Sequence, residues 1–111
     1  MARHGSATVL TVSGEIDLVT SAQLAESIDA ASTANNPPAL IVDLTDVPFL
    51  ASMGMTVLLD ASRRVSDTTM FAVVADGPNT SRPLTLLGLD KEITLYTDLD
   101  TALAAVEAHR S

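Results

Sequence analysis

The feature that most limits the fold of this chain is a nearly unbroken apolar run at residues 39–44, in which Asp43 is the polar exception. A run of this length without alternation is typical of a central strand covered on both faces. Such a strand lies inside a sheet that has helices packed against it, so the run predicts an α/β fold.

The rest of the chain alternates between strand-like and helix-like segments. The strand-like segments are short, apolar and rich in β-branched residues, whereas the helix-like segments repeat apolar residues at spacings of three and four. This alternation predicts right-handed crossovers, a largely parallel sheet and one domain covering residues 1–111. The predicted strands cover residues 8–12, 39–44, 70–75 and 93–96, and the predicted helices begin near Thr20, Met53, Arg82 and Leu99.

Three of the predicted helices have candidate capping residues at their amino ends. Thr20 stands three residues before Gln23, which is the spacing of a capping box. Ser52 precedes the second helix and is expected to be its N-cap, with the hydroxyl oxygen accepting a backbone N–H. Asp98 or Thr97 is expected to cap the last helix in the same way.

The charge balance excludes several classes of function. Fourteen Asp and Glu residues face six Lys and Arg residues, which gives a formal net charge of −8. The basic residues are scattered, and only Arg63 and Arg64 are adjacent, so binding to nucleic acid or to an anionic membrane is not expected. The chain has no cysteine, which excludes disulfides and thiol chemistry. No apolar run is long enough for a signal peptide or a membrane span, so we expect a cytoplasmic protein.

Catalytic motifs are absent from the sequence. The two histidines, His4 and His109, lie in the terminal segments, which argues against a Ser-His-Asp triad. The G-x-S-x-G pattern of a nucleophile elbow fails because residue 50 is leucine, and the glycines are too far apart for a phosphate-binding loop. We therefore expect no catalytic residue, no metal and no cofactor.

Two acidic residues, Asp43 and Asp46, lie near the carboxyl end of the central strand. Open α/β sheets often place binding sites there. The alternative is that the two carboxylates accept hydrogen bonds from loop N–H groups, and we favour this structural role.

Ser52 is the residue with the clearest potential function. Free N–H groups and the helix dipole converge at the start of a helix, so a phosphate on this serine would add nearly two negative charges at an electropositive end. The fold should tolerate that charge, whereas a partner docked over the serine would not. Gly54 keeps the backbone uncrowded, and Met53 falls off the apolar stripe and is expected to be exposed.

Four short motifs occur in order along the chain. They are Gly14-Glu15-Ile16-Asp17, Val42-Asp43-Leu44 followed by Val47 and Phe49, Ser52-x-Gly54, and Gly88-Leu89-Asp90. Together these motifs resemble the STAS domains of bacterial anti-sigma factor antagonists. The resemblance covers residues 9–106 and implies a mixed, mostly parallel sheet of four or five strands with about four helices.

The resemblance implies a regulatory role without enzyme activity. In this family, the unmodified antagonist binds an anti-sigma factor that is itself a serine kinase, and thereby frees a sigma factor. The kinase phosphorylates a serine at the start of the second helix, which weakens binding, and a phosphatase resets the switch. Ser52 matches that serine, and Asp17 matches an acidic residue in the neighbouring loop. The implied contact surface comprises Asp17, Leu18, Thr20, Ala51, Ser52, Met53, Gly54, Met55 and Thr56.

The sequence departs from the family pattern beside the serine and at the front of the chain. Family members commonly have Asp-Ser-Ser-Gly where this chain has Ala51-Ser52-Met53-Gly54, so two polar neighbours of the acceptor serine are missing. The family also begins with a strand that pairs with residues 8–12, and here that strand is expected to be missing or very short. The open sheet edge would favour a homodimer. The main alternative function is a small-ligand sensor, in which the start of the second helix holds a nucleotide phosphate.

Overall fold

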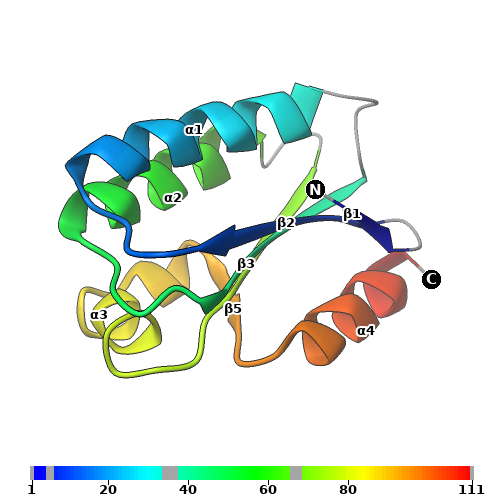
Figure 1. Cartoon of the computed structure of the whole chain (residues 1–111). Coiled ribbons are helices and arrows are strands. Elements are labelled where there is room, and N and C mark those ends of the chain that lie inside the picture. Colours follow the sequence, from blue (N-terminus) through cyan, green and yellow to red (C-terminus); the bar gives the residue numbers. More distant parts are fainter. Residues whose placement is uncertain (1, 5–6, 34–37, 66–68, 111) are drawn as a thin grey trace.

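The computed structural model describes residues 2–4, 7–33, 38–65 and 69–110, and the side chains of residues 2–4, 18, 109 and 110 lie outside this description. The described chain forms one five-stranded sheet with helices on both faces (Figure 1). The strands are β1 (Ala2–His4), β2 (Ala7–Ser13), β3 (Ala39–Asp46), β4 (Met70–Val74) and β5 (Thr94–Tyr96). The helices are α1 (Leu18–Thr33), α2 (Ser52–Val65), α3 (Ser81–Leu86), the 3-10 helix η1 (Leu89–Lys91) and α4 (Leu99–Arg110).

The sheet has the strand order β1-β2-β3-β4-β5, with β3 at its centre. Strands β2 to β5 run parallel, and β1 runs antiparallel to β2. The residues of the apolar run, 39–44, are all buried in β3. The predicted α/β class and the mixed, mostly parallel sheet are therefore confirmed.

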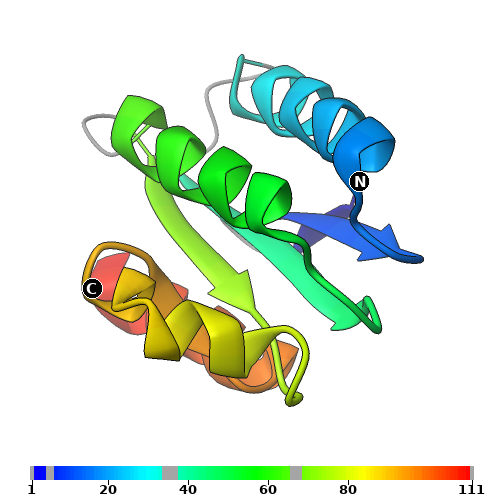
Figure 2. The ribbon, with the colours of Figure 1, turned by 90° about the vertical axis from the view of Figure 1, so that its left-hand side faces the viewer.

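Side chains of β3 alternate between two cores, one on each face of the sheet. Leu40, Val42 and Leu44 belong to the core beneath α1 and α2, whereas Ala39 and Ile41 belong to the core beneath α4. Figure 2 shows α1 (blue to cyan) and α2 (green) side by side over one face, with α4 (orange to red) on the other. Burial on both sides explains why the run has no polar alternation.

The apolar stripe predicted for α1 faces the first of these cores. Leu24, Ile28 and Ala31 are all buried. On the exposed side, Arg64 of α2 forms an ion pair with Asp29 of α1 at 2.7 Å, which joins the two helices near their carboxyl ends. Within the described ranges, no helix is both long and apolar enough to span a membrane.

The N-cap of α4 is Asp98, one of the two candidates that the sequence offers. Its Oδ1 accepts the backbone N–H of Thr101 at 2.7 Å, and its Oδ2 accepts the Thr101 hydroxyl at 2.9 Å. These hydrogen bonds, chiefly the one from the backbone, lower the pKa of Asp98 below the ordinary value of 3.8. The charged carboxylate therefore stabilises the start of α4.

The first strand is present but very short. β1 pairs with residues 7–9 of β2, and beyond Val9 no described residue forms a strand along the outer edge of β2. The register of β2 against β3 shifts between Thr11 and Ser13, because β3 has one more residue than β2 over this stretch. The first part of the edge that was predicted to be open is therefore covered by β1.

Candidate functional site

Three loops lie at the carboxyl ends of the parallel strands, on the left of Figure 1. Residues 14–17 join β2 to α1, residues 47–51 join β3 to α2, and residues 75–80 join β4 to α3. This is the edge at which open α/β sheets commonly bind their ligands and partners.

Backbone hydrogen bonds connect these three loops into one surface. The N–H of Ile16 donates to the carbonyl oxygen of Phe49 at 3.0 Å, and the N–H of Ala51 donates to the carbonyl oxygen of Ile16 at 2.9 Å. The N–H of Leu50 donates to the carbonyl oxygen of Asn79 at 3.1 Å. The starts of α1 and α2 are therefore held beside each other by reciprocal main-chain bonds.

Gly54, in the first turn of α2, lies against two buried side chains. A Cβ atom at this position would be 2.6 Å from Ile16 Cγ2 and 2.6 Å from Leu50 Cδ1. Both neighbours are only 2% exposed. A glycine therefore allows the close approach of α2 to the loop of residues 14–17.

The N-cap of α1 is Asp17, so the prediction that Thr20 caps this helix is wrong. Asp17 Oδ1 accepts the backbone N–H groups of Val19 at 3.1 Å and of Thr20 at 3.0 Å. In return, Thr20 Oγ1 accepts the N–H of Asp17 at 2.7 Å, so Thr20 occupies the third position of a capping box that begins three residues earlier. The bonds from Thr20 chiefly lower the pKa of Asp17, which keeps its exposed carboxylate charged.

Ser52 is the first residue of α2, and the prediction that it is the N-cap is wrong. The N–H of Met55 donates to the carbonyl oxygen of Ala51 at 3.2 Å, which makes Ala51 the N-cap residue. The Ser52 side chain is exposed, and within the described part of the chain its hydroxyl makes no hydrogen bond. The hydroxyl is therefore accessible to a partner.

Exposed apolar side chains occupy the same loops and helix starts. Val19 is 68% exposed, and Phe49 and Met53 are each 48% exposed. The exposure of Met53 was predicted and is confirmed, whereas Phe49 and Val19 were not identified as surface residues. A large aromatic residue in a loop between a strand and a helix is the one sequence signal that could have indicated Phe49.

The structure divides the predicted contact residues into a surface group and a supporting group. Members of the first are exposed or partly exposed, and members of the second lie beneath them and cannot touch a partner without rearrangement. The first group is Asp17, Thr20, Ala51, Ser52, Met53 and Thr56, and the second is Gly54 and Met55. The side chain of Leu18 lies outside the described residues.

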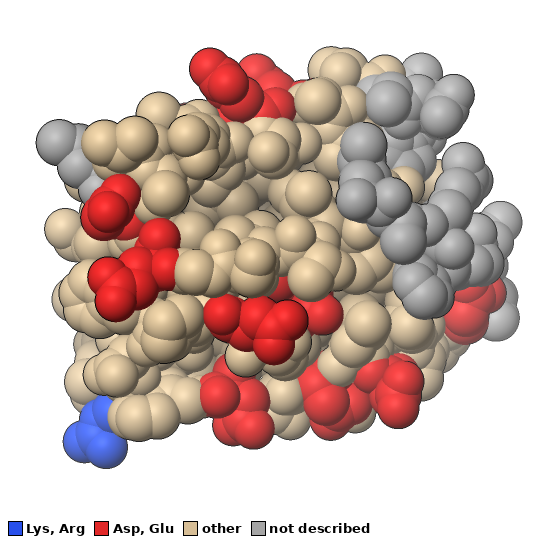
Figure 3. Space-filling model, viewed as in Figure 1, with Lys and Arg blue, Asp and Glu red and all other residues tan. Residues whose placement is uncertain are grey.

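Acidic residues dominate the charge near this surface. Residues 7–33 contain four acidic residues, Glu15, Asp17, Glu26 and Asp29, and contain no Lys or Arg. Acidic side chains are spread over the face seen in Figure 3, where basic side chains are few. This charge favours a partner with a basic contact surface.

Asp43 has the structural role favoured from the sequence. Its Oδ1 accepts the backbone N–H of Thr45 at 3.0 Å and the Thr45 hydroxyl at 2.8 Å, and the residue is buried. Asp46 is exposed at the end of β3. The side chains of His4 and His109 lie outside the described residues, and among the residues described no group of three His, Cys, Asp or Glu could hold a metal ion.

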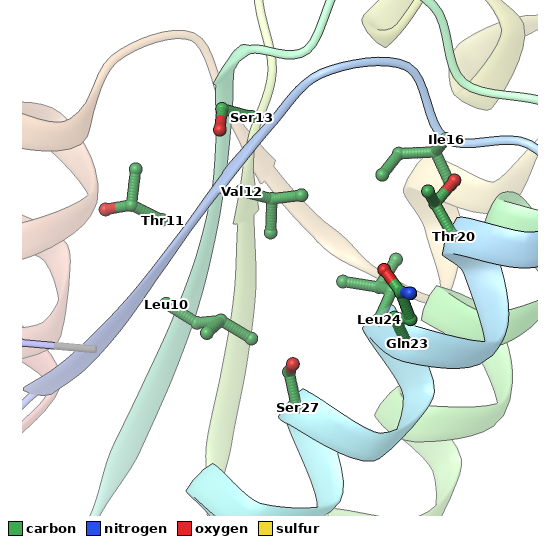
Figure 4. Close-up of a pocket in the computed structure, with 9 residues that line it drawn as sticks. All are labelled: Leu10, Thr11, Val12, Ser13, Ile16, Thr20, Gln23, Leu24 and Ser27. Carbon is green, nitrogen blue, oxygen red and sulfur yellow. The ribbon is translucent and has the colours of Figure 1, made fainter.

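A groove of about 210 Å³ lies between β2 and α1 (Figure 4). Figure 4 shows Leu10 and Val12 pointing from β2 toward α1, while Thr11 and Ser13 point the other way. No Lys or Arg lines the groove, so it offers no cation to pair with a nucleotide phosphate. The groove is lined by Leu10, Thr11, Val12, Ser13, Ile16, Thr20, Gln23, Leu24 and Ser27.

Comparison with known proteins agrees with this fold. Residues 1–102 match the family model described as the STAS domain. The anti-sigma-F factor antagonist RsfB of Mycobacterium tuberculosis is 43% identical over 110 residues, which cover 99% of this chain and 89% of that protein. The crystal structure of an anti-sigma factor antagonist from Mycobacterium paratuberculosis is 46% identical, with a TM-score of 0.89 over 96% of this chain and 90% of that chain. The anti-sigma factor antagonist SpoIIAA in its unphosphorylated form has the same fold, with 18% identity and a TM-score of 0.73 over 92% of this chain and 89% of that chain.

Proposed function

Because the chain belongs to the STAS domain family, we propose that it is an anti-sigma factor antagonist that binds a serine-kinase anti-sigma factor and so releases a sigma factor. RsfB and the protein from Mycobacterium paratuberculosis carry that name and match this chain along nearly its whole length. The chain itself acts by binding and not by catalysis, and it acts in the cytoplasm. A serine phosphatase would reset the switch.

The observation that carries the proposal is the position of the Ser52 hydroxyl. It is exposed at the first turn of α2 and has no hydrogen bond among the described residues. The backbone N–H of Ala51 donates a hydrogen bond to the carbonyl oxygen of Ile16. Ser52 follows Ala51 and Asp17 follows Ile16, so this bond holds Ser52 and Asp17 on the same part of the surface. A kinase can therefore reach this hydroxyl without unfolding any element of the domain.

Phosphorylation at Ser52 would act on the partner and not on the fold. A phosphoserine carries about −1.5 to −2 charges, and the N–H groups of the first helical turn stabilise such a charge. On the surface, however, the phosphate would stand near the charged Asp17 carboxylate and the exposed apolar side chains of Phe49 and Met53. A partner that covers these residues would have to remove water from the phosphate, so binding becomes weaker.

The binding switch is tested by titrating the cognate anti-sigma factor into the full chain in a calorimeter. We expect Ser52→Glu to weaken binding by about tenfold or more, because it adds charge within the interface. Ala104→Glu adds the same charge on an exposed position of α4, across the sheet, and should bind like the wild type. Phe49→Ala should also weaken binding, since it removes an exposed aromatic contact. Equal affinities for the wild type and Ser52→Glu would contradict the switch.

The modification itself is tested by intact mass spectrometry after incubation with the anti-sigma factor and ATP. One added phosphate on the wild type and none on Ser52→Ala would support the assignment of the acceptor. An unmodified wild type, or a phosphate that persists in Ser52→Ala, would overturn that assignment. This experiment is informative because Ala51 and Met53 replace the polar neighbours that are common in the family.

A further inference from the structure

The residue before Ser52 does not favour the helix that it begins. Ala51 is the N-cap residue of α2, a position where Asn, Asp and Ser are preferred because their side-chain oxygen accepts a backbone N–H of the first turn. Alanine has no such oxygen. In α1 and α4 the corresponding bonds are made by Asp17, at 3.0 Å, and by Asp98, at 2.7 Å. The helix that carries the proposed site therefore lacks a stabilisation that these two helices have.

The residue after Ser52 also departs from local preference. Met53 lies in the first turn of α2 and is 48% exposed, which leaves a long apolar side chain in water. Met55, two residues further on, is only 7% exposed and belongs to the core beneath this helix. Residues that break a local preference with no gain in stability are expected at functional sites, where another requirement decides them.

Apolar side chains border the Ser52 hydroxyl. The N–H of Ile16 donates to the carbonyl oxygen of Phe49 at 3.0 Å, and the carbonyl oxygen of Ile16 accepts the N–H of Ala51 at 2.9 Å. These bonds hold the loop before α2 against the loop before α1, so the apolar residues of both helix starts lie at one end of the sheet. They form an apolar rim that consists of Val19, Phe49, Ala51 and Met53, all of them exposed or partly exposed.

The rim is suited to a partner that covers it with an apolar surface. Apolar residues at the centre of an interface gain from being removed from water, whereas a polar side chain there loses its water. A carboxylate or amide at position 51 would find no hydrogen-bond partner opposite an apolar face, and its burial would weaken the complex. The reverse also holds, because polar groups of a partner would be left unpaired against Ala51 and Met53.

We propose that the partner covers Ser52 with an apolar contact face, and that Ala51 and Met53 select this partner at the expense of the stability of α2. The inference rests on the proposed function and adds the chemistry of the partner's contact face. It also explains why the best N-cap residues are absent from the helix that carries the site.

The test measures unfolding and partner binding on the same variants of the full, unmodified chain. Ala51→Asn supplies a neutral N-cap, so the urea midpoint should rise. Its amide NH₂ group must lose water beneath an apolar partner, so the affinity for the cognate anti-sigma factor should fall about five- to tenfold. A purely structural role of position 51 would not make stability and affinity change in opposite directions.

Variants of Met53 test the apolar character of the contact in the same calorimetric titrations. Met53→Ser should weaken binding about five- to tenfold, whereas Met53→Leu keeps an apolar side chain and should bind within about twofold of the wild type. Binding of the wild type should have a negative heat-capacity change, because apolar surface is buried, and this change should be smaller in magnitude for Met53→Ser.

A matched control and three outcomes decide the inference. Ala104→Asn adds the same amide at an exposed position of α4, across the sheet, and should leave the affinity unchanged. If the wild type binds and both Ala51→Asn and Met53→Ser bind equally well, the inference is wrong and the proposed function stands. Equal losses for Met53→Leu and Met53→Ser would also overturn it, because apolar character would then not be the property that is recognised. If the wild type does not bind, the proposed function itself fails, and this inference fails with it.

Discussion

Replacing Gly54 by alanine is expected to destabilise the protein, because the new methyl group has no room. Its Cβ would lie 2.6 Å from Ile16 Cγ2 and 2.6 Å from Leu50 Cδ1, about 1 Å short of ordinary contact between carbon atoms. Both neighbours are 2% exposed, so neither can rotate into free space. Overpacking costs about 1–3 kcal/mol, and two simultaneous clashes place the cost near 3 kcal/mol. Alanine is favoured over glycine in a helix by about 1 kcal/mol, which offsets part of this cost. The free energy of unfolding should therefore fall by about 2 kcal/mol.

The assay is thermal unfolding of Gly54→Ala beside the wild type. A loss of about 2 kcal/mol in the free energy of unfolding should lower the melting temperature of a domain of this size by roughly 10 °C. Gly77→Ala is the matched control, because a Cβ there meets Thr80 Oγ1 at an ordinary 3.5 Å. Its free energy of unfolding should change by less than about 0.5 kcal/mol.

A double-mutant cycle shows whether the clash with Ile16 is the cause. Ile16→Ala removes Cγ2 and should destabilise the protein by roughly 2–5 kcal/mol when introduced alone. The combined Ile16→Ala and Gly54→Ala variant should be more stable than the sum of the two losses predicts, by about 1 kcal/mol. The tight contact between α2 and the loop of residues 14–17 is refuted if Gly54→Ala has the same melting temperature as the wild type. It is also refuted if the losses in free energy of unfolding of the two single variants simply add in the double variant.

Two further predictions concern the helix caps. Ala51→Ser supplies the hydroxyl that the N-cap position of α2 lacks, so the free energy of unfolding should rise by about 1 kcal/mol. In urea unfolding this rise should appear as a higher midpoint at an unchanged slope. An unchanged midpoint would mean that Ala51 is not the N-cap. Asp17 and Asp98 have pKa values lowered from 3.8 by backbone hydrogen bonds, so their stabilisation is complete above that value and is lost as the pH falls through the folded-state pKa values. Urea midpoints of the wild type should therefore fall more steeply below about pH 4 than those of the combined Asp17→Asn and Asp98→Asn variant, and parallel profiles would contradict this reasoning.

Local sequence pattern predicts the exposure of a site residue only where it places that residue on one side of a helix. Met53 falls off the apolar stripe of α2, and its exposure follows from the helical period alone. Phe49 is different, because no local pattern distinguishes it from its buried neighbour Leu50. The path of the loop is set by the bond from the N–H of Ile16 to the carbonyl oxygen of Phe49, between residues far apart in the sequence.

The sequence by itself determined the layers of this protein. The unbroken apolar run at residues 39–44 requires cover on both faces of β3, and the spacing of Leu24, Ile28 and Ala31 directs one face of α1 to the core, whichever residues it meets there. These properties depend on the period of each element, which a short segment already specifies.

Only the tertiary structure decided how the elements end and where they meet. Asp17 and Thr20 both stand at capping positions, and the turn out of β2 makes Asp17 the N-cap. Three residues become β1 because they pair with residues 7–9 of β2. The glycine at position 54 is required by Leu50 of the preceding loop and by Ile16 of the loop between β2 and α1. The contact of Ile16 with Gly54 joins segments that are distant along the chain, and such a contact exists only once the sheet and helices are assembled.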